Sequence, residues 1–288
     1  MQVTMLSDVR PRPRRVAVGE FDGVHIGHRE VIAGNDTVLT FEPHPLAVVR
    51  PEAAPRLLTS FEARVELIAA LDVRELVVIP FDEHFAAQSP QEFIDHVLVG
   101  RLRATDVSVG ENFHFGHKAA GDTDMLAADA RFRTRVVPLV EVDGEVVSSS
   151  HIRGLVSAGD VERANHFLGV PFQMRGEVVL GDRRGRELGF PTANIVPDET
   201  LVCPGHGVYA ARADGACAAV SVGVRPTFGT GRAVLVEAYL VDREVDLYGH
   251  VLRIDFLDRL RGERRFESVE ALVAQMRIDV EQTRALCG

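Results

Sequence analysis

The sequence predicts a two-domain protein of the α/β plus β class. Its first part is an α/β domain with a parallel sheet, and its second part is a small antiparallel β-barrel with a terminal α-helix. Up to Gly169, short β-branched runs alternate with helical segments, which is typical of a parallel sheet with crossover helices. After Gly169, strand-like runs are separated by turns rich in Gly and Pro, as in an antiparallel barrel. The length of 288 residues fits two domains, which we place at 1–169 and 170–288.

The first domain is predicted to consist of strands joined by helices. The expected strands are Val16–Val18, Thr37–Phe41, Glu75–Pro80, Asp106–Gly110 and Arg135–Val142. Two helix starts carry the capping-box spacing, in which a hydroxyl residue stands three positions before a glutamate: Thr59 before Glu62, and Ser89 before Glu92. Pro90 fits the first turn of the second helix, where no backbone N–H is needed. Both helices start between strands, as crossover helices do.

The second domain is predicted to be a series of strands closed by one helix. The expected strands are Gly176–Leu180, Gly207–Ala213, Ala218–Gly223, Val234–Val241 and His250–Leu257. In the last segment, Ser268–Cys287, apolar residues recur at helical spacing: Val269, Leu272, Val273, Met276 and Val280. This pattern predicts an amphipathic helix that packs on the barrel.

Composition excludes several classes of function. The chain has 42 acidic and 32 basic residues, a net charge of -10, so a general nucleic-acid or anionic-membrane binder is not expected. No apolar run approaches the roughly 20 residues of a membrane span, and the first residues include no hydrophobic signal segment, so we expect a cytoplasmic protein. The three cysteines are far apart and show no CxxC spacing or disulfide framework. We therefore expect them to be small core or surface residues.

A glycine-rich segment after the first strand predicts a phosphate site. Residues Gly19–His28 read GEFDGVHIGH. Glycines at the carboxyl end of a first strand let backbone N–H groups approach a phosphate, and the next helix N-terminus adds a favourable dipole. His25 and His28 bracket Gly27, so both imidazoles can point into one crevice and offset the charge of a leaving pyrophosphate. The alternative is a metal site of His25, His28 and His44, although no HExxH frame supports it.

A second glycine-rich segment starts at Gly176 and reads GEVVLGDRRGRELGFPTANI. It predicts a strand, a turn and a second strand. Gly181 and Gly189 permit close backbone approach, Arg186 supplies local positive charge, and Thr192 offers a hydroxyl suited to Mg²⁺ or phosphate. On this segment alone, a β-hairpin with a basic tip is an equal alternative.

Glu237 is an acidic residue on a strand whose other residues are mostly apolar. Alternation along Val234–Val241 places it on one face with Leu235 and Tyr239, and places Val236 and Ala238 on the other. A carboxylate in this position is either paired, which is a structural role, or desolvated with a raised pKa. The second state suits the removal of a proton near neutral pH.

Four segments of the first domain occur together in one order. They are GEFDGVHIGH at 19–28, TFEPHP at 40–45, VGENFHFG at 109–116 and VSSSHIR at 147–153. In this combination the chain resembles the FMN adenylyltransferase half of the bifunctional prokaryotic riboflavin kinase/FAD synthetases. The resemblance implies a Rossmann-like nucleotidyltransferase domain that transfers AMP from ATP to FMN.

The resemblance also implies roles for single residues of the first domain. His25 and His28 match the motif that contacts the ATP phosphates, and Arg153 belongs to the motif that closes on them. The other residues expected at ATP or its phosphates are Gly19, Phe21, Asp22, Gly23, Gly27, Ser149 and Ser150. Asn112 and Phe113 match the segment that lies on the flavin side of the site.

The second domain resembles the riboflavin kinases. The tetrapeptide PTAN at 191–194 matches their signature, and GVYAAR, SVGVRPTFG and VEAYLVD follow in the family order. The resemblance implies that Glu237 is the general base that activates the ribityl 5′-hydroxyl for attack on the γ-phosphate of ATP. It implies that Thr192 and Asn194 hold Mg²⁺, and that Gly181, Arg186 and Gly189 contact ATP. For Arg225, a role in a turn is as plausible as contact with a ligand.

The sequence thus predicts an enzyme that phosphorylates riboflavin to FMN and adenylylates FMN to FAD, with ATP and Mg²⁺ required and pyrophosphate released in the second step. Its partners are small-molecule substrates, and no oligomeric state is predicted. His151 stands where the family usually has Lys or Arg, and the segment from His28 to Thr37 is short for a crossover. These departures motivate one alternative, a riboflavin kinase with a weak or inactive adenylyltransferase domain. A flavin-binding regulatory protein without turnover is the other.

Overall fold

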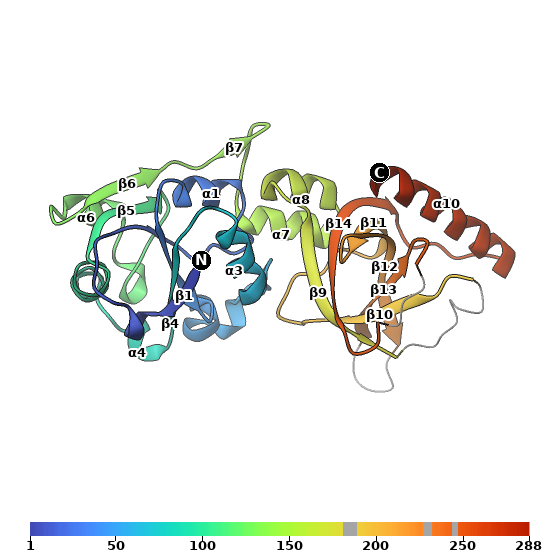
Figure 1. The fold of residues 1–288 in the computed structure, drawn as a ribbon, viewed down its shortest axis with the longest axis horizontal. Coiled ribbons are helices and arrows are strands. Elements are labelled where there is room, and N and C mark those ends of the chain that lie inside the picture. Colours follow the sequence, from blue (N-terminus) through green and yellow to red (C-terminus); the bar gives the residue numbers. More distant parts are fainter. Residues whose placement is uncertain (181–188, 227–231, 244–246, 288) are drawn as a thin grey trace. The chain divides into compact units, whose positions relative to one another are not determined.

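The computed structural model describes residues 1–180, 189–226, 232–243 and 247–287, without the side chains of 224–226 and 232–233. Its contacts divide the chain into two compact units, Met1–Ser149 and Ser150–Gly288. Figure 1 shows a sheet with helices in the first unit, and a barrel with a long terminal helix in the second. The predicted fold class is confirmed for each unit.

The sheet of the first unit has six strands in the order β1-β4-β3-β2-β5-β6, and all neighbouring pairs are parallel. The strands are β1 (Gln2–Met5), β2 (Arg14–Val18), β3 (Thr37–Glu42), β4 (Glu75–Pro80), β5 (Ala104–Gly110) and β6 (Arg133–Val137). Successive side chains point to opposite faces, so Val16 and Val18 pack in one buried cluster and Ala17 in another. The carboxyl ends of β2, β3 and β5 therefore meet at one edge of a sheet that is covered on both faces.

Helices cover the two faces of this sheet. Val31 and Ile32 of α1 and Ile68 of α3 pack on one face, and Phe93 and Val97 of η3 pack on the other. The helices are α1 (Ile26–Ile32), α2 (Pro45–Val49), α3 (Phe61–Ala69), α4 (Glu83–Ala86), α5 (Pro90–Glu92), the π-helical η3 (Phe93–Arg101), α6 (Thr123–Ala128) and the short 3-10 segments η1 (Leu6–Asp8), η2 (Pro51–Ala53) and η4 (His117–Ala119). The first crossover helix, α1, has seven residues, or about two turns, as its short segment predicts.

One of the two predicted capping boxes is confirmed and the other is wrong. The Ser89 hydroxyl accepts a hydrogen bond from the Glu92 N–H, and the Glu92 carboxylate accepts one from the Ser89 N–H. At α3, Ser60 is the N-cap, and its hydroxyl accepts from the Ala63 N–H. The Thr59 hydroxyl instead forms hydrogen bonds with the loop after β2. A tertiary contact therefore replaces the helix-capping role that the local sequence pattern predicts for Thr59.

Two further expectations for the first unit differ from the structure. The strand expected at Arg135–Val142 is two elements, β6 and β7 (Glu141–Val142), and β7 pairs with β8 (Glu145–Val146). Pro138 lies between them and has no N–H to give to a strand ladder. The sequence also gave no indication of β1, a short edge strand whose Val3 and Met5 are exposed.

The second unit is a closed barrel with the strand order β10-β13-β12-β11-β14-β9. Its strands are β9 (Phe172–Val179), β10 (Thr192–Pro197), β11 (Gly207–Ala213), β12 (Ala216–Pro226), β13 (Arg232–Leu240) and β14 (Val251–Arg261). Adjacent strands are antiparallel, as the turn-rich sequence predicts. Ile195, Val220 and Val236 are fully buried on neighbouring strands. Closure leaves this sheet without a free edge.

Two helices precede the barrel: α7 (Ser149–Ala158) and α8 (Val161–Leu168). α8 packs on β14 and β9. The division by contacts, after Ser149, therefore falls before the boundary that we expect at 169. The assignment of domains to 1–169 and 170–288 stays a prediction.

The terminal helix, α10 (Val269–Cys287), packs on β11, β12 and β14. Val280 is 7% exposed, as predicted, but Val269 is 57% exposed and lies outside the packed face. A disulfide joins Cys217 on β12 to Cys287 at the end of α10, with 5.9 Å between the Cα atoms. The expectation that the cysteines form no disulfide is wrong, because the fold brings together residues that are far apart in sequence. No helix in the described ranges is long and apolar enough to cross a membrane.

Candidate functional site

The loop after β2 adopts a backbone that few residues tolerate. Phe21, Gly23 and Val24 all have positive φ angles, of 55°, 82° and 42°. Gly19 packs closely on the Phe21 ring, since a Cβ there would lie 3.0 Å from it. The Gly19 N–H donates to the Leu39 carbonyl at 3.1 Å. The loop therefore turns the chain sharply from the sheet edge into α1.

The structure brings the two predicted histidines together. His25 is the N-cap of α1, and its Nδ1 accepts a hydrogen bond from the His28 N–H at 3.2 Å. The imidazole rings stack with 3.5 Å between their centroids and 17° between their planes. Gly27 lies against this stack, since a Cβ there would be 3.3 Å from the His25 ring. Both rings therefore act as one unit at the start of a helix, where the dipole favours anions.

Asp22 and Gly23 have hydrogen-bond partners within the protein. The Asp22 carboxylate accepts from the N–H groups of Leu58 and Thr59 at 2.9 and 3.1 Å, and the Gly23 N–H donates to the Thr59 hydroxyl at 3.1 Å. The Ser149 hydroxyl donates to the Asp22 carbonyl at 2.9 Å. These contacts fix the loop on residues 58–59 and on the start of α7. The contact of Asp22 and Gly23 with a phosphate stays a prediction.

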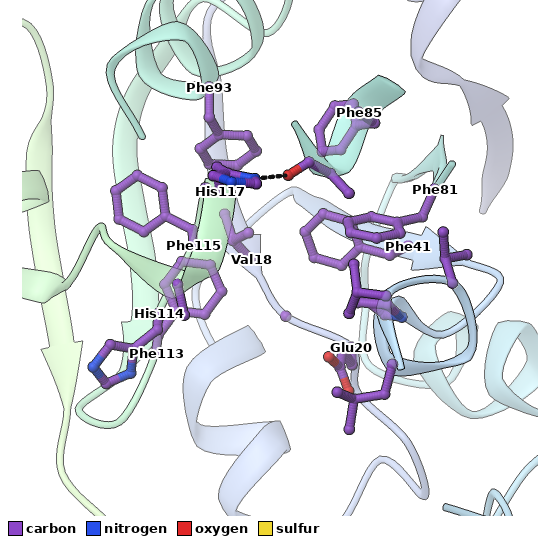
Figure 2. A pocket seen from close by; sticks show the side chains of 18 of the residues that line it. Val18, Glu20, Phe41, Phe81, Phe85, Phe93, Phe113, His114, Phe115 and His117 are labelled. Atoms are coloured by element: carbon purple, nitrogen blue, oxygen red, sulfur yellow. Dashed lines mark hydrogen bonds between the residues drawn. The ribbon is translucent and has the colours of Figure 1, made fainter. Parts of the chain in front are cut away.

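A cavity of about 1120 Å³ lies beside this loop in the first unit. Gly19, Phe21 and His28 line it at one side. Figure 2 shows aromatic rings from several elements around the same space, and these are Phe41, Phe81, Phe85, Phe93, Phe113 and Phe115. Neighbouring rings contact one another, as in the T-shaped pair of Phe41 and Phe81 with centroids 5.8 Å apart. A large aromatic cavity next to a phosphate-type loop suits a flat heteroaromatic ring that carries a phosphate.

Asn112 and Phe113 follow β5 and line the cavity. Their segment continues into a loop that presents His114, His117 and Lys118 to the same space. Gly116 is required here, because it has a φ of 73° and a Cβ would lie 2.6 Å from the Pro90 nitrogen. The His117 ring contacts the Ala86 carbonyl at 3.2 Å (Figure 2). The sequence located Asn112 and Phe113, but it did not indicate the polar side chains that follow them.

A polar network at the carboxyl ends of β2 and β3 was not predicted. Nε2 of the buried His44 donates to the Glu20 carboxylate at 2.6 Å, while its Nδ1 accepts from the Leu46 N–H. Arg64 of α3 is 2% exposed and donates to the Glu20 carbonyl at 2.9 Å and to the Glu42 carboxylate. The sequence contained one indication that Arg64 is buried, which is its spacing. Arg64 lies four residues before the buried Ile68, on the helix face that packs on the sheet.

The motif at 147–153 lies at the start of α7. Arg153 and Ser150 are one helical turn apart, and Arg153 Nη1 lies 3.5 Å from the Ser150 hydroxyl. The His151 ring packs on Phe167 of α8, with 5.0 Å between the ring centroids. Ser150 and Arg153 belong to the second compact unit, and their contact with ATP phosphates stays a prediction.

The predicted kinase residues lie on two adjacent strands of the barrel. Asn194 of β10 is directly opposite Glu237 of β13, and Thr192 is opposite Tyr239. Val236 and Ala238 are fully buried, so alternation places Glu237 on the other face of β13, as predicted. Ser221 of β12 flanks Glu237 on its other side. Thr192, Asn194 and Glu237 therefore share one face, and the cross-strand neighbours of Glu237 are polar, not apolar as its own strand suggested.

Some predicted residues of this site lie outside the described part of the chain. Gly181 and Arg186 are among them, and the side chain of Arg225 is not described. Gly189 is described, with a φ of 85° and open space where a Cβ would stand. It begins the approach to β10, and the neighbouring Phe190 ring contacts Tyr239 in a T-shaped pair at 5.2 Å.

The oxygen atoms on β10 and β13 fit a magnesium ion. Thr192 offers a hydroxyl, Asn194 an amide oxygen and Glu237 a carboxylate. Mg²⁺ prefers such oxygen ligands and takes few from the protein when substrate phosphates supply the others. Across the described residues, no group of three or more His, Cys, Asp or Glu side chains could hold a metal ion. This gives no support to the alternative of a metal site built from His25, His28 and His44.

Comparisons with known proteins match both halves of the chain. The FAD synthetase family matches residues 8–151, and the riboflavin kinase family matches residues 168–287. Proteins named bifunctional riboflavin kinase/FMN adenylyltransferase are similar over most of their length. That of Listeria monocytogenes is 37% identical over 94% of this chain and 91% of the relative. That of Bacillus subtilis is 35% identical over 93% and 90%, and that of Escherichia coli K12 is 34% identical over 95% and 92%.

One solved structure is similar over the whole chain. It is a Streptococcus pneumoniae protein titled a macrolide-efflux protein, with a TM-score of 0.89, 29% identity and coverage of 99% of both chains. The likeness shows that the same arrangement of elements occurs in a crystal structure.

Proposed function

The chain belongs to the family of bifunctional riboflavin kinase/FMN adenylyltransferases, and from this premise we propose which of its residues carry each reaction. The enzyme phosphorylates riboflavin to FMN and adenylylates FMN to FAD. Its substrates are ATP, riboflavin and FMN. The roles of single residues, the requirement for Mg²⁺, the two domain ranges and the cytoplasmic location are proposals.

The adenylyltransferase site is the loop at 19–28 and the cavity beside it. The stacked His25 and His28 bind the ATP phosphates and stabilise the charge that develops as pyrophosphate leaves. The α1 N-terminus adds its dipole to this effect. Ser149, the last residue of the first unit, adds a phosphate contact. The FMN phosphate then attacks the α-phosphate of ATP directly, so no covalent enzyme intermediate is needed.

The cavity at the edge of the sheet holds the flavin. Its phenylalanines supply the apolar surfaces that an isoalloxazine ring requires. Because the chain has no Trp, stacking on this ring depends on Phe and Tyr. Asn112 supplies a polar contact on the wall of this cavity and orients the ring. Gly19 and His28 line the same cavity, which supports a binding mode with the phosphate end of FMN near the histidine pair.

The kinase site is the shared face of β10 and β13. Glu237 takes the proton of the ribityl 5′-hydroxyl as the oxygen attacks the γ-phosphate of ATP. Thr192 and Asn194 would hold Mg²⁺, which when bound neutralises charge on the phosphates. Gly181, Arg186 and Gly189 contact ATP. The single observation that carries this proposal is the register of β10 with β13, which puts Asn194 beside Glu237.

The relatives support two activities over a kinase with an inactive first domain, since they carry both names and match along both halves. The residue assignment is tested by a reciprocal pair of variants. We expect His28→Ala to lower FMN adenylylation by about 10²-fold or more, the usual loss for a missing transition-state contact, and to leave the kinase rate unchanged. We expect Glu237→Gln to lower the kinase rate by at least about 100-fold and to leave adenylylation unchanged.

Each variant serves as the control for the other, because both reactions are followed by chromatography of the same preparation. Normal FAD formation by His28→Ala would remove the histidine pair from the reaction. A near-normal kinase rate in Glu237→Gln would show that Glu237 is not the base.

A further inference from the structure

The loop directly before the His25–His28 pair has a strained backbone conformation that depends on contacts with other parts of the protein. Two of the residues with positive φ, Phe21 and Val24, carry side chains, and Val24 is β-branched. Such conformations are strained and persist only where surrounding contacts over-determine them.

The first set of contacts comes from the residues just before α3. The Asp22 carboxylate is 2% exposed and accepts hydrogen bonds from the Leu58 N–H, the Thr59 N–H and the Thr59 hydroxyl, at 2.9, 3.1 and 3.3 Å. The same hydroxyl accepts from the Gly23 N–H. These hydrogen bonds hold Asp22 and Gly23 in place within the left-handed stretch, residues 21–24, where Phe21, Gly23 and Val24 have positive φ angles.

The second contact comes from α3 itself. Arg64 is a buried cation, and its Nη1 donates to the Glu20 carbonyl at 2.9 Å, directly before the left-handed stretch. Its other partners are the Glu42 carboxylate and the Phe41 carbonyl at the end of β3. The guanidinium therefore connects the segments that follow β2 and β3 to the helix. Arg64 itself does not line the cavity.

We propose that Asp22, Thr59 and Arg64 form a clasp that positions the His25–His28 pair for adenylyl transfer. Within this clasp, Asp22 and Arg64 are positioning residues that act through the loop and need not touch ATP. The inference rests on the proposed role of the histidine pair. It gives the Asp22 carboxylate a different task from the phosphate contact that the resemblance implied.

A positioning role has a distinct kinetic signature. The histidines contact phosphates that are already charged in bound ATP, but they act most strongly on the additional charge that develops as pyrophosphate leaves, so their misplacement lowers kcat more than it raises KM. A displacement of about 1 Å can lower a rate by about 10²-fold. We therefore expect Asp22→Asn to lower kcat for FAD formation by about 10²-fold with little change in KM for ATP or FMN. The amide N–H₂ would replace Oδ2, which accepts from the Leu58 N–H at 3.0 Å, and the remaining hydrogen bonds would lose the carboxylate charge that strengthens them.

The matched control is Asp129→Asn. Asp129 also accepts a backbone N–H, from Arg131 at 3.0 Å, but lies after α6 in the same unit. We expect its kcat for FAD formation to stay within about twofold of the wild type, the change expected of a site outside the clasp. FMN binding, measured by quenching of flavin fluorescence, shows whether the cavity of each variant is intact.

The decisive measurement is a double-mutant cycle with His28→Ala. If the clasp acts through the histidine pair, Asp22→Asn lowers kcat by about 10²-fold in the wild type but by less than about threefold when His28 is already absent. If the two losses multiply, or if Asp22→Asn has a normal kcat, the proposal is wrong. If Asp22→Asn fails to bind FMN, Thr59→Val replaces it in the same cycle with the same criteria.

The cycle separates this proposal from the one on which it rests. A normal rate in His28→Ala alone contradicts the role of the histidine pair. A low rate in His28→Ala together with a normal rate in Asp22→Asn contradicts only the clasp.

Discussion

Thr192 is the residue where the proposal for the kinase site is most specific. It begins β10 and lies opposite Tyr239, two register pairs from the pair of Asn194 and Glu237 and on the same face. We expect Thr192→Val to raise the Mg²⁺ concentration needed for half-maximal kinase rate by about tenfold or more, because valine keeps the shape but loses the hydroxyl oxygen. The measurement is a Mg²⁺ titration of FMN formation at saturating ATP.

Thr200→Val is a matched control for this substitution. Thr200 follows β10 in an exposed turn and donates its hydroxyl to Asp198. Its Mg²⁺ titration should match that of the wild type. An unchanged titration in Thr192→Val would contradict the role of its hydroxyl.

At the residue scale, the sequence predicts what is local and misses what depends on packing. His25 and His28 are one helical turn apart, so their spacing alone brings the rings together. The contact between Asp22 and Thr59 spans 37 residues, and that between Arg64 and Glu20 spans 44. Both depend on how α3 packs on the sheet. For the same reason Thr59 looked like a helix cap, although its hydroxyl binds Asp22 and Gly23.

At the scale of elements, a buried ion pair joins the amino ends of β2 and β4, at the edge of the sheet opposite the site. Burial alone would raise the pKa of Glu75, but hydrogen bonds and charge from Arg14 and Arg12 outweigh it and lower the pKa below 4.5. A carboxyl whose folded-state pKa is lowered stabilises the fold above its unfolded pKa, and this stability is lost as the pH falls through the folded-state value.

We expect Glu75→Gln to lower the free energy of unfolding of the first unit by about 3 kcal/mol at neutral pH, since the buried Arg14 loses its counter-ion. The difference from the wild type should shrink as the pH falls below 4.5, where the wild-type carboxyl becomes protonated. Urea unfolding at a series of pH values measures both effects. A difference that stayed constant with pH would show that the ion pair is not its cause.

The terminal helix provides the second prediction at this scale. The disulfide between Cys217 and Cys287 closes a loop with a sequence separation of 70. We expect Cys217→Ser to lower the free energy of unfolding of the barrel by about 2–4 kcal/mol under oxidising conditions, mainly because the unfolded chain gains freedom. Cys203→Ser, at the cysteine that is not part of the disulfide, should have no such effect. Equal stability of Cys217→Ser and the wild type in denaturant without reductant would contradict the prediction.

The predictability of elements follows the strength of their local pattern. β11 occupies Gly207–Ala213, the predicted range, because turn residues bound it on both sides. The strand expected at Arg135–Val142 ends early because Pro138 interrupts the ladder. α10 was predicted from its apolar spacing, but the exposed Val269 shows that spacing does not say how far a helix packs on its barrel. The disulfide needed the fold as well as the sequence.

At the scale of the whole molecule, each compact unit has a sheet of its own kind and a proposed site of its own. The first places the loop at 19–28 and an aromatic cavity at the carboxyl edge of a parallel sheet. The second places polar residues on adjacent strands of a closed barrel. FMN is the product of the barrel reaction and the substrate of the other, so the two sites form a reaction sequence in which FMN must pass from one site to the next.

The most direct test of this account is a chromatographic time course of the purified protein with riboflavin, ATP and Mg²⁺, repeated with FMN as the starting flavin. The account predicts that riboflavin gives FMN first and FAD after a delay, and that FMN gives FAD without delay. FMN without FAD in both reactions would contradict it by showing that the first unit is inactive, and the absence of both products would contradict it altogether.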